Sequence, residues 1–486
     1  MLFNSYEFIF IFLPITFFIY FFLNSKRLTK ASKIFLIVSS LFFYSWWNII
    51  YLPLIIISVL FNYAIGLLLT KHSRYTKRQR KLLLTTGIVA NISLLGYFKY
   101  SDFFISNINF LFSSDISLLN LTLPLAISFF SFQQIAYLID SYKNETKEYS
   151  FINYCIFITF FPQLIAGPIV HHREMMPYFE SAKTKIINYK NISKGIYVFS
   201  IGLFKKVVIA DSFSIWATNG FDVAQTLSLL EAWATSLSYT FQLYFDFSGY
   251  CDMAIGAALL FNIKLPVNFN SPYKATNIQD FWRRWHITLS KFLRDYIYIP
   301  LGGNRQGEAK TYVNLMATFL IGGIWHGAGW TFIFWGFLHG LALVVFRIWG
   351  KYSIKLNKIL AWILTFNFIN ITWVFFRAKE WGDAIKVLKG MCGFSSVTLP
   401  NFLSDHLHCL SAYGVKFANT FLAIGGDKNM IAYIIFAFIL TLTQKNSIEK
   451  TNSLILNYKT YTVAAFMFVC SIILLKQESE FLYFNF

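Results

Sequence analysis

Two histidines are the side chains of this chain best suited to acid–base chemistry. His326 is the only ionisable residue in the stretch IGGIWHGAGW (321–330), and apolar runs lie on both sides of it. An ionisable group in an apolar membrane segment is costly and points to function. Burial favours the neutral imidazole, which is the form that accepts a proton. We therefore predict His326 as a general base, and the alternative is a packing histidine that hydrogen-bonds a neighbouring helix.

His286 lies in a polar, basic and aromatic stretch whose spacing predicts one helix over 278–295. Asn277, followed three residues later by Asp280, has the pattern of a helix start. Such a helix would lie at the cytoplasmic membrane interface. Its expected apolar face consists of Trp282, Trp285, Leu289 and Phe292, and its expected polar face of Arg283, His286, Ser290 and Arg294.

The polar face of this helix leaves two alternatives for His286. Its imidazole either contacts solvent or headgroups, or points into the same cavity as His326 from the cytoplasmic side. Arg283 and Arg294 would lie near an anionic headgroup or a nucleotide phosphate, which guanidinium groups bind through charge-assisted hydrogen bonds.

Further polar residues interrupt apolar runs elsewhere. Gln242 and Asp246 are four residues apart, so they share one face of an expected helix. Asp246 either pairs with a buried Lys or Arg or orients an imidazole. Lys205 and Lys206 interrupt another span, where we expect them to snorkel or to act as counter-ions.

The spacing of histidine and cysteine predicts no metal site. His171 and His172 are adjacent, but no third or fourth ligand is near them in sequence. His406, His408 and Cys409 lie close together in an expected outer loop, and the five cysteines include no CxxC pair. We therefore expect neither a bound metal nor a disulfide framework.

The composition indicates which elements must position these residues. Of 486 residues, 56% are hydrophobic, 20% are aromatic and 13% are charged, the last about half of the usual fraction in soluble proteins. A soluble fold could not bury so much apolar surface, so we predict an all-α polytopic membrane protein. The net charge of +19 arises mostly from short loops between apolar runs. It therefore indicates topology and contact with anionic lipid, and no nucleic acid is expected.

We expect one transmembrane domain over 1–486, with about 11 spanning helices and a cytoplasmic interfacial segment over 264–311. No internal repeat of the transporter kind is visible. The candidate spans lie near 6–23, 34–48, 50–70, 82–98, 121–139, 195–220, 226–246, 312–327, 329–346, 358–376, 429–444 and 460–476.

Basic loops set the expected orientation. Loops 26–33 and 71–81 hold four and six basic residues and are separated by two spans, so both are placed on the cytoplasmic face. The first span is then a retained helix with its N-terminus outside.

The stretch FINYCIFITFFPQLIAGPIV (151–170) is apolar but is interrupted by Pro162, Gly167 and Pro168. Lysines flank both of its ends, which favours a re-entrant segment that dips into the membrane and returns. Non-helical backbone at that depth must be lined by protein or water, so we expect a central cavity.

Several of these stretches resemble one family. FQLYFDFSGYCDMAIGAALLFNIKLPVNFNSPYKATNIQDFWRRWHITLSKFLRDYIYIPLGGNR and GGIWHGAGWTFIFWGFLHG look like membrane-bound O-acyltransferases, and within them like the bacterial alginate O-acetylation branch. FIFLPITFFIYFFL, SFFSFQQIAYLID and FPQLIAGPIV also match that branch. The resemblance covers most of residues 1–350 and is looser beyond them.

The resemblance implies a membrane fold around a central tunnel and the transfer of an acetyl group from a cytoplasmic thioester, acetyl-CoA, towards an extracytoplasmic polysaccharide. His326 matches the family's invariant intramembrane histidine, and His286 matches its second histidine. The expected substrate-binding residues are Trp325, Arg283, Asp246, Gln242 and Asn304.

The resemblance also implies a bacterial inner-membrane location and a separate periplasmic SGNH-type acetyltransferase as partner. No bound cofactor is expected besides the thioester donor. The acceptor is alginate, another exopolysaccharide or, as an alternative, peptidoglycan.

A hypothesis from another class is a proton-coupled transporter in which His326 relays protons. It requires repeat symmetry and charged residues in several helices, and the sequence shows neither clearly.

Overall fold

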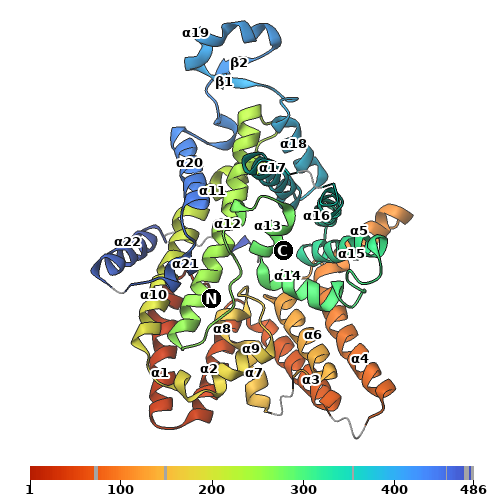
Figure 1. The fold of residues 1–486 in the computed structure, drawn as a ribbon, viewed down its shortest axis with the longest axis vertical. Helices are drawn as coiled ribbons and strands as arrows, with labels where there is room; N and C mark the ends of the chain where they lie inside the picture. Colours follow the sequence, from red (N-terminus) through yellow and green to blue (C-terminus); the bar gives the residue numbers. More distant parts are fainter. Residues whose placement is uncertain (71–74, 147–149, 353–354, 456, 476–480, 483–486) are drawn as a thin grey trace. The chain divides into compact units, whose positions relative to one another are not determined.

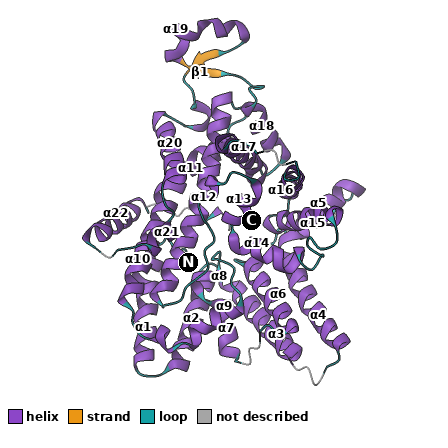
Figure 2. Cartoon of the chain, in the orientation of Figure 1, coloured by secondary structure: helices purple, strands orange, loops and turns teal. Residues whose placement is uncertain are grey.

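The described part of the chain is mostly helical. The computed structural model describes all residues except 71–74, 147–149, 353–354, 456, 476–480 and 483–486, so part of the expected basic loop 71–81 lies outside the described residues. Figure 2 shows strand only at β1 (Thr398–Pro400) and β2 (Lys416–Ala418), which pair in parallel. The predicted all-α class is confirmed.

Among the described residues, five helices are long and apolar enough to cross a membrane. Shorter apolar helices at Lys428–Thr443 and Tyr458–Leu474 add to them, so the chain is a multi-pass membrane protein. The five long helices are Glu7–Ser25, Ile49–Thr70, Lys77–Phe112, Trp330–Tyr352 and Lys358–Arg377.

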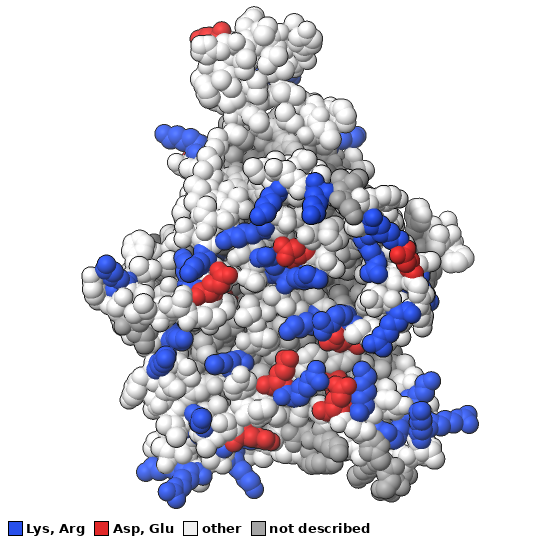
Figure 3. All heavy atoms as spheres, in the orientation of Figure 1, with Lys and Arg blue, Asp and Glu red and all other residues white. Residues whose placement is uncertain are grey.

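The outer faces of these helices are apolar. Phe18 and Phe22 are 69% and 60% exposed, and Val345 is 52% exposed. Such side chains are costly in water and are typical of a surface that contacts lipid. On the face drawn in Figure 3, Lys and Arg outnumber Asp and Glu, in accord with 42 basic and 23 acidic residues in the chain.

The described chain forms two compact units that interleave in sequence. The first comprises Met1–Leu203, Tyr250–Val267 and Thr451–Asn485, and the second mainly Phe204–Gly249 and Asn268–Lys450. The prediction of a single domain over the whole chain stays a prediction. The first unit contains a π-helical turn (Glu7–Phe12), α1 (Leu13–Ser25), α2 (Thr29–Ser45), α3 (Leu52–Thr70), α4 (Lys77–Leu95), α5 (Ser101–Phe112), α6 (Ile127–Lys143), α7 (Phe151–Thr159), α8 (Phe161–Leu164), α9 (His172–Glu180), α10 (Tyr189–Phe204) and α22 (Tyr458–Leu474).

Helices α3, α4 and α6 of the first unit run side by side (Figure 1). Buried amides join them: Asn62 Nδ2 donates to Gln134 Oε1 at 2.6 Å, and Asn91 Nδ2 donates to Asn62 Oδ1 at 2.7 Å. Polar side chains that bond across helices hold membrane bundles together. This network therefore fixes the three helices without any charged group.

The stretch 151–170 is an interrupted helix, as its sequence predicts. Helix α7 ends before Phe160, whose backbone leaves the helical region, and α8 begins with Pro162 in its first turn. Gln163 Nε2 donates to the carbonyl of Phe157 across the break, at 2.5 Å. The segment is buried in protein, which is the condition for irregular backbone in a membrane protein. Its path into and out of the membrane stays a prediction.

The second unit carries all of the predicted site residues. The long helix α12 (Leu229–Leu260) begins in this unit and ends in the first. The other helices of the unit are α11 (Asp211–Thr218), α13 (Ile278–Arg284), α14 (Ile287–Leu293), α15 (Glu308–His326), α16 (Trp330–Trp349), α17 (Lys358–Arg377), α18 (Trp381–Met391), α19 (Ser404–Leu407), α20 (Lys428–Thr443) and α21 (Ser447–Asn452), whose end lies in the first unit.

Helices α15 and α16 form a tight hairpin in which small residues let the two backbones touch. A Cβ atom at Gly336 would collide with the carbonyl oxygen of Phe319, and one at Gly323 with that of Phe332. Close approach at small residues is a common way of packing membrane helices. It leaves His326 as the last residue of α15, at the hairpin tip.

We expect Gly336→Ala to push α16 away from α15 and to destabilise the protein by about 1–3 kcal/mol, as overpacking does in a close-packed interior. The measurement is thermal unfolding of the detergent-purified protein. Gly382→Ala in α18 is the matched control, because a Cβ there meets nothing within 4 Å. Equal melting temperatures for the two variants would contradict the backbone contact.

Candidate functional site

The predicted single helix over 278–295 is wrong, because the structure divides it into α13 and α14. Asn277 does begin α13, since its side chain accepts the backbone N–H of Asp280 at 2.7 Å. At Trp285 the backbone becomes extended, and His286 is left-handed with φ +42°. His286 is therefore fully buried, whereas Arg283, predicted on the same face, is exposed.

The segment around Asn268 explains the break. The carbonyl of Asn268 accepts the N–H of Ile287 at 3.0 Å, and its side-chain Oδ1 accepts the N–H and the hydroxyl of Thr288 at 3.1 and 2.9 Å. In one continuous helix these N–H groups would bond to the carbonyls four residues earlier, those of Arg283 and Arg284. Bonds to Asn268 replace the helical bonds and set the direction of α14.

Asn268 also fixes the tautomer of His286. Its Oδ1, which can only accept, lies 3.2 Å from Nδ1 of His286, so Nδ1 carries the proton and Nε2 has the lone pair. The ring of Phe247 from α12 packs edge-on against this imidazole at 4.9 Å between centroids. His286 is thus held at a defined angle in a buried setting.

His326 has the same tautomer for a similar reason. Its Nδ1 lies 2.6 Å from the carbonyl oxygen of Gly322, one turn earlier in α15. Because a carbonyl only accepts, Nδ1–H donates and Nε2 is the basic nitrogen. Trp325, Trp335 and Phe376 surround the ring edge-on at centroid distances of 4.8, 4.9 and 5.3 Å. The imidazole of His326 therefore lies inside a cage of three aromatic rings.

The ring of Trp325 contacts both His286 and His326. Its ring contacts His286 at 6.2 Å and His326 at 4.8 Å between centroids, and only 4% of the residue is exposed. The pKa of His286 lies well below its usual range, first because of burial and second because of the nearby His326. Both imidazoles therefore belong to one cluster, in which His286 is neutral at physiological pH.

A third buried histidine of the second unit, His339 of α16, was not predicted. Trp282 Nε1 donates to His339 Nδ1 at 3.1 Å, so Nε2 of His339 carries the proton and donates to the hydroxyl of Thr372, also at 3.1 Å. Both of its ring nitrogens are engaged, which suits a structural role more than a proton-accepting one. The signal in the sequence was a second apolar stretch with a histidine, FLHG.

The carboxylate of Asp246 forms an ion pair with a buried lysine, one of the two roles predicted for it. Its Oδ1 lies 2.7 Å from Nζ of Lys206, which also contacts Asp211 at 2.9 Å. Such pairing is how a membrane interior tolerates charge. Among the described residues, no donor reaches the buried Oε1 of Gln242, one turn away on the same face of α12. Gln242 can therefore accept a hydrogen bond from a bound molecule.

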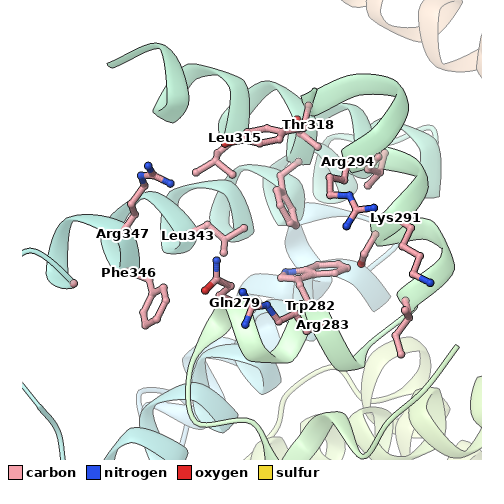
Figure 4. A pocket seen from close by; sticks show the side chains of 16 residues that line it. Gln279, Trp282, Arg283, Lys291, Arg294, Leu315, Thr318, Leu343, Phe346 and Arg347 are labelled. Atoms are coloured by element: carbon pink, nitrogen blue, oxygen red, sulfur yellow. The ribbon is translucent and has the colours of Figure 1, made fainter. Parts of the chain in front are cut away.

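The remaining predicted site residues lie outside the histidine cluster. Arg283 lines a cavity between α13, α14, α15 and α16, together with Trp282 and Arg294 (Figure 4). Asn304 is exposed in the turn between α14 and α15, and no contact among the described residues joins it to His286 or His326. No three His, Cys, Asp or Glu side chains of the described chain are grouped to hold a metal ion.

Comparison with known proteins gives a consistent result. The family described as "MBOAT, membrane-bound O-acyltransferase family" matches residues 9–379. A peptidoglycan O-acetyltransferase of Helicobacter pylori is 49% identical, over 100% of this chain and 98% of its own length. Probable alginate O-acetylases AlgI of Azotobacter vinelandii and Pseudomonas putida are 37% and 36% identical, over 89% and 100% of this chain and 86% and 100% of their own lengths.

Asn268 gives a direct test of the His286 geometry. We expect Asn268→Asp to keep the acceptor for Thr288 while its negative charge favours the imidazolium of His286 and raises its pKa. The acidic limb of the pH–rate profile of acyl transfer should then move to higher pH. Asn268→Ala removes the acceptor, which costs about 1–3 kcal/mol for a buried donor left unsatisfied, and should lower the rate at every pH.

The pH–rate profile of acyl transfer in purified protein is the measurement, and Asn401→Asp, at an exposed position near β1, is the charge-matched control. If Asn268→Asp has the same acidic limb as the wild type, Asn268 does not act on a titrating His286.

Proposed function

Because the chain belongs to the membrane-bound O-acyltransferase family, we propose that His326 is the general base of an acetyl transfer from a thioester to a polysaccharide hydroxyl. The chain is a membrane-embedded O-acyltransferase. The observation that carries the proposal is the hydrogen bond from Nδ1 of His326 to the carbonyl of Gly322. It leaves Nε2 as the proton-accepting nitrogen, inside an aromatic cage that limits water.

In the proposed reaction, His326 first accepts a proton and later returns it. Nε2 takes the proton of the incoming hydroxyl while the hydroxyl oxygen attacks the thioester carbonyl carbon. The tetrahedral intermediate then collapses, the carbon–sulfur bond breaks, and the thiolate leaves with the proton returned from Nε2. His286, held by Asn268 at 3.2 Å, positions the reacting groups from the other side of Trp325. Exclusion of water by the surrounding aromatic rings would limit hydrolysis of the thioester.

Five residues are proposed to contact or position the substrates. Trp325 would separate the donor and acceptor sides of the cluster, and Gln242 would accept a hydrogen bond from a substrate hydroxyl through its buried Oε1. Asp246 would act indirectly, by holding α12 through Lys206. Arg283 would bind an anionic group, either the phosphates of the donor or a headgroup. Asn304 stays a prediction supported only by the resemblance of its stretch to the family.

We propose acetyl-CoA as donor and the glycan of peptidoglycan as acceptor. The Helicobacter pylori relative named for peptidoglycan is 49% identical, and the relatives named for alginate are 36–40% identical. These values favour peptidoglycan over alginate. Alginate or another exopolysaccharide is the second candidate, because the relatives named for alginate match 81–100% of the chain.

The cell context of the reaction is also proposed. A periplasmic SGNH-type acetyltransferase would finish delivery, and the chain would lie in the inner membrane with its N-terminus in the periplasm. The support is the distribution of basic loops, which the positive-inside rule places on the cytoplasmic side. A transporter with His326 as a proton relay is less well supported, since the family is one of acyltransferases.

We expect His326→Ala to abolish O-acetylation, because loss of a general base lowers the rate by about 10²–10⁴-fold. His286→Ala should reduce it less completely, because positioning is partly redundant whereas proton removal is not. The measurement is mass spectrometry of O-acetylated muropeptides from cells that carry each variant as their only copy, with membrane levels matched by immunoblot.

His408→Ala is the matched control, since this histidine is exposed and lies far along the chain from the cluster. A well-accumulated His326→Ala variant with near wild-type acetylation would remove the general-base role. Acetylated alginate or another exopolymer alongside unchanged muropeptides would leave that role intact and change the acceptor.

A further inference from the structure

A cavity of about 640 Å³ lies between α13, α14, α15 and α16 in the second unit (Figure 4). Neither His326 nor His286 lines it. Its inner wall includes Trp282, whose indole N–H donates to His339. The cavity is therefore a separate site next to the structural histidine.

The walls on the hairpin side are apolar. Leu315 and Phe319 of α15 face the cavity together with Leu343 and Phe346 of α16, which is part of the long apolar helix Trp330–Tyr352. In Figure 4, Leu315 and Leu343 lie across the cavity from Trp282 and Arg283 of α13. Walls of this kind suit a hydrocarbon chain and give few hydrogen bonds to a polar molecule.

The rim of the same cavity is basic. Arg283, Lys291, Arg294 and Arg347 line it, and no lining residue is acidic. Arg294 is held by Asp295 at 2.7 Å. Within the described part of the chain, no carboxylate lies at ion-pair distance from the other three cations. Glu308 is close enough to Arg347 to be affected by its charge, but it is bound to Lys351. The rim thus presents uncompensated positive charge beside an apolar interior.

The position of the rim matches a membrane–water boundary. Arg347 lies in the last turn of α16, and the exposed aromatic residues Trp349 and Tyr352 follow it. Two residues before Arg347, Val345 is exposed on the apolar part of the same helix. Aromatic residues next to basic ones at a helix end are typical of the headgroup layer. From this pattern we infer that the apolar half of the cavity lies at hydrocarbon depth and Arg347 at headgroup depth.

We propose that this cavity binds one anionic phospholipid. Its phosphate contacts Arg283, Lys291 and Arg347 through charge-assisted hydrogen bonds, and an acyl chain lies against Leu315, Phe319 and Leu343. The proposal goes beyond acyl transfer, since it uses neither imidazole of the cluster. It selects the headgroup over the donor phosphates because a water-soluble nucleotide would leave the apolar walls without a partner.

The test is native mass spectrometry of the full-length detergent-purified protein titrated with phosphatidylglycerol or with phosphatidylcholine of the same acyl chains. The wild type should retain one phosphatidylglycerol with about tenfold preference, the discrimination that roughly 1.4 kcal/mol of charge interaction gives. Arg283→Ala/Arg347→Ala should lose this preference. Leu315→Trp, which fills the apolar half, should bind both lipids more weakly. Trp282 is left unchanged because it holds His339.

Lys389→Ala/Lys416→Ala is the charge-matched control, because both lysines are exposed and neither lines the cavity. It should bind as the wild type does. Equal retention of phosphatidylglycerol by the control and by Arg283→Ala/Arg347→Ala would overturn the proposal, as would equal retention of the two lipids by the wild type. Displacement of phosphatidylglycerol by coenzyme A would also overturn it and assign the cavity to the donor. The measurement of lipid binding does not depend on acetyl transfer. The lipid proposal can therefore fail while the proposed function holds, and the reverse is also true.

Discussion

The hydrogen bond between Nδ1 of His326 and the carbonyl of Gly322 decides what the site can do. It settles which nitrogen is basic, and it exists because His326 is the last residue of α15, one turn after Gly322. The end of α15 is in turn placed by the backbone contact between α15 and α16 at Gly323 and Gly336. The acid–base chemistry proposed for His326 thus depends on the absence of two Cβ atoms in the neighbouring helical turns.

The three buried histidines of the second unit differ in the hydrogen-bond partners of their rings. His339 donates and accepts within the protein, through Thr372 and Trp282. His326 and His286 each donate from Nδ1 to an oxygen, of Gly322 and Asn268 respectively. Asn268 and Gly322 therefore set the tautomers of His286 and His326, whereas both ring nitrogens of His339 are engaged within the protein.

Local signals in the sequence were sufficient for part of this site. The apolar run around His326, the helix start at Asn277 and the shared face of Gln242 and Asp246 are all set by residues within one or two turns, and the structure contains each of them. The cost of buried charge predicted either a counter-ion or an imidazole partner for Asp246, but it did not identify Lys206, forty positions earlier, as the partner.

Other features depend on residues distant in sequence. The helical spacing of apolar residues continues through 278–295. The helix is interrupted there because Asn268 supplies hydrogen-bond acceptors for the N–H groups of Ile287 and Thr288. The engagement of His339 depends on Trp282, 57 residues away. The basic rim of the cavity likewise combines Arg283 with Arg347, from helices whose pairing no local pattern specifies. Spacing along one helix cannot reveal any of these.

The central claim is that the imidazoles of His286 and His326 border the same substrate cavity. The most direct test is a cryo-electron microscopy structure with a non-hydrolysable ketone analogue of acetyl-CoA. In this analogue a methylene group replaces the sulfur atom that is bonded to the carbonyl carbon. The account predicts the ketone carbon beside Nε2 of His326, with His286 and Trp325 bordering the same continuous cavity. Density for the ketone away from His326, or two imidazoles opening into separate cavities with packed helix between them, would contradict it.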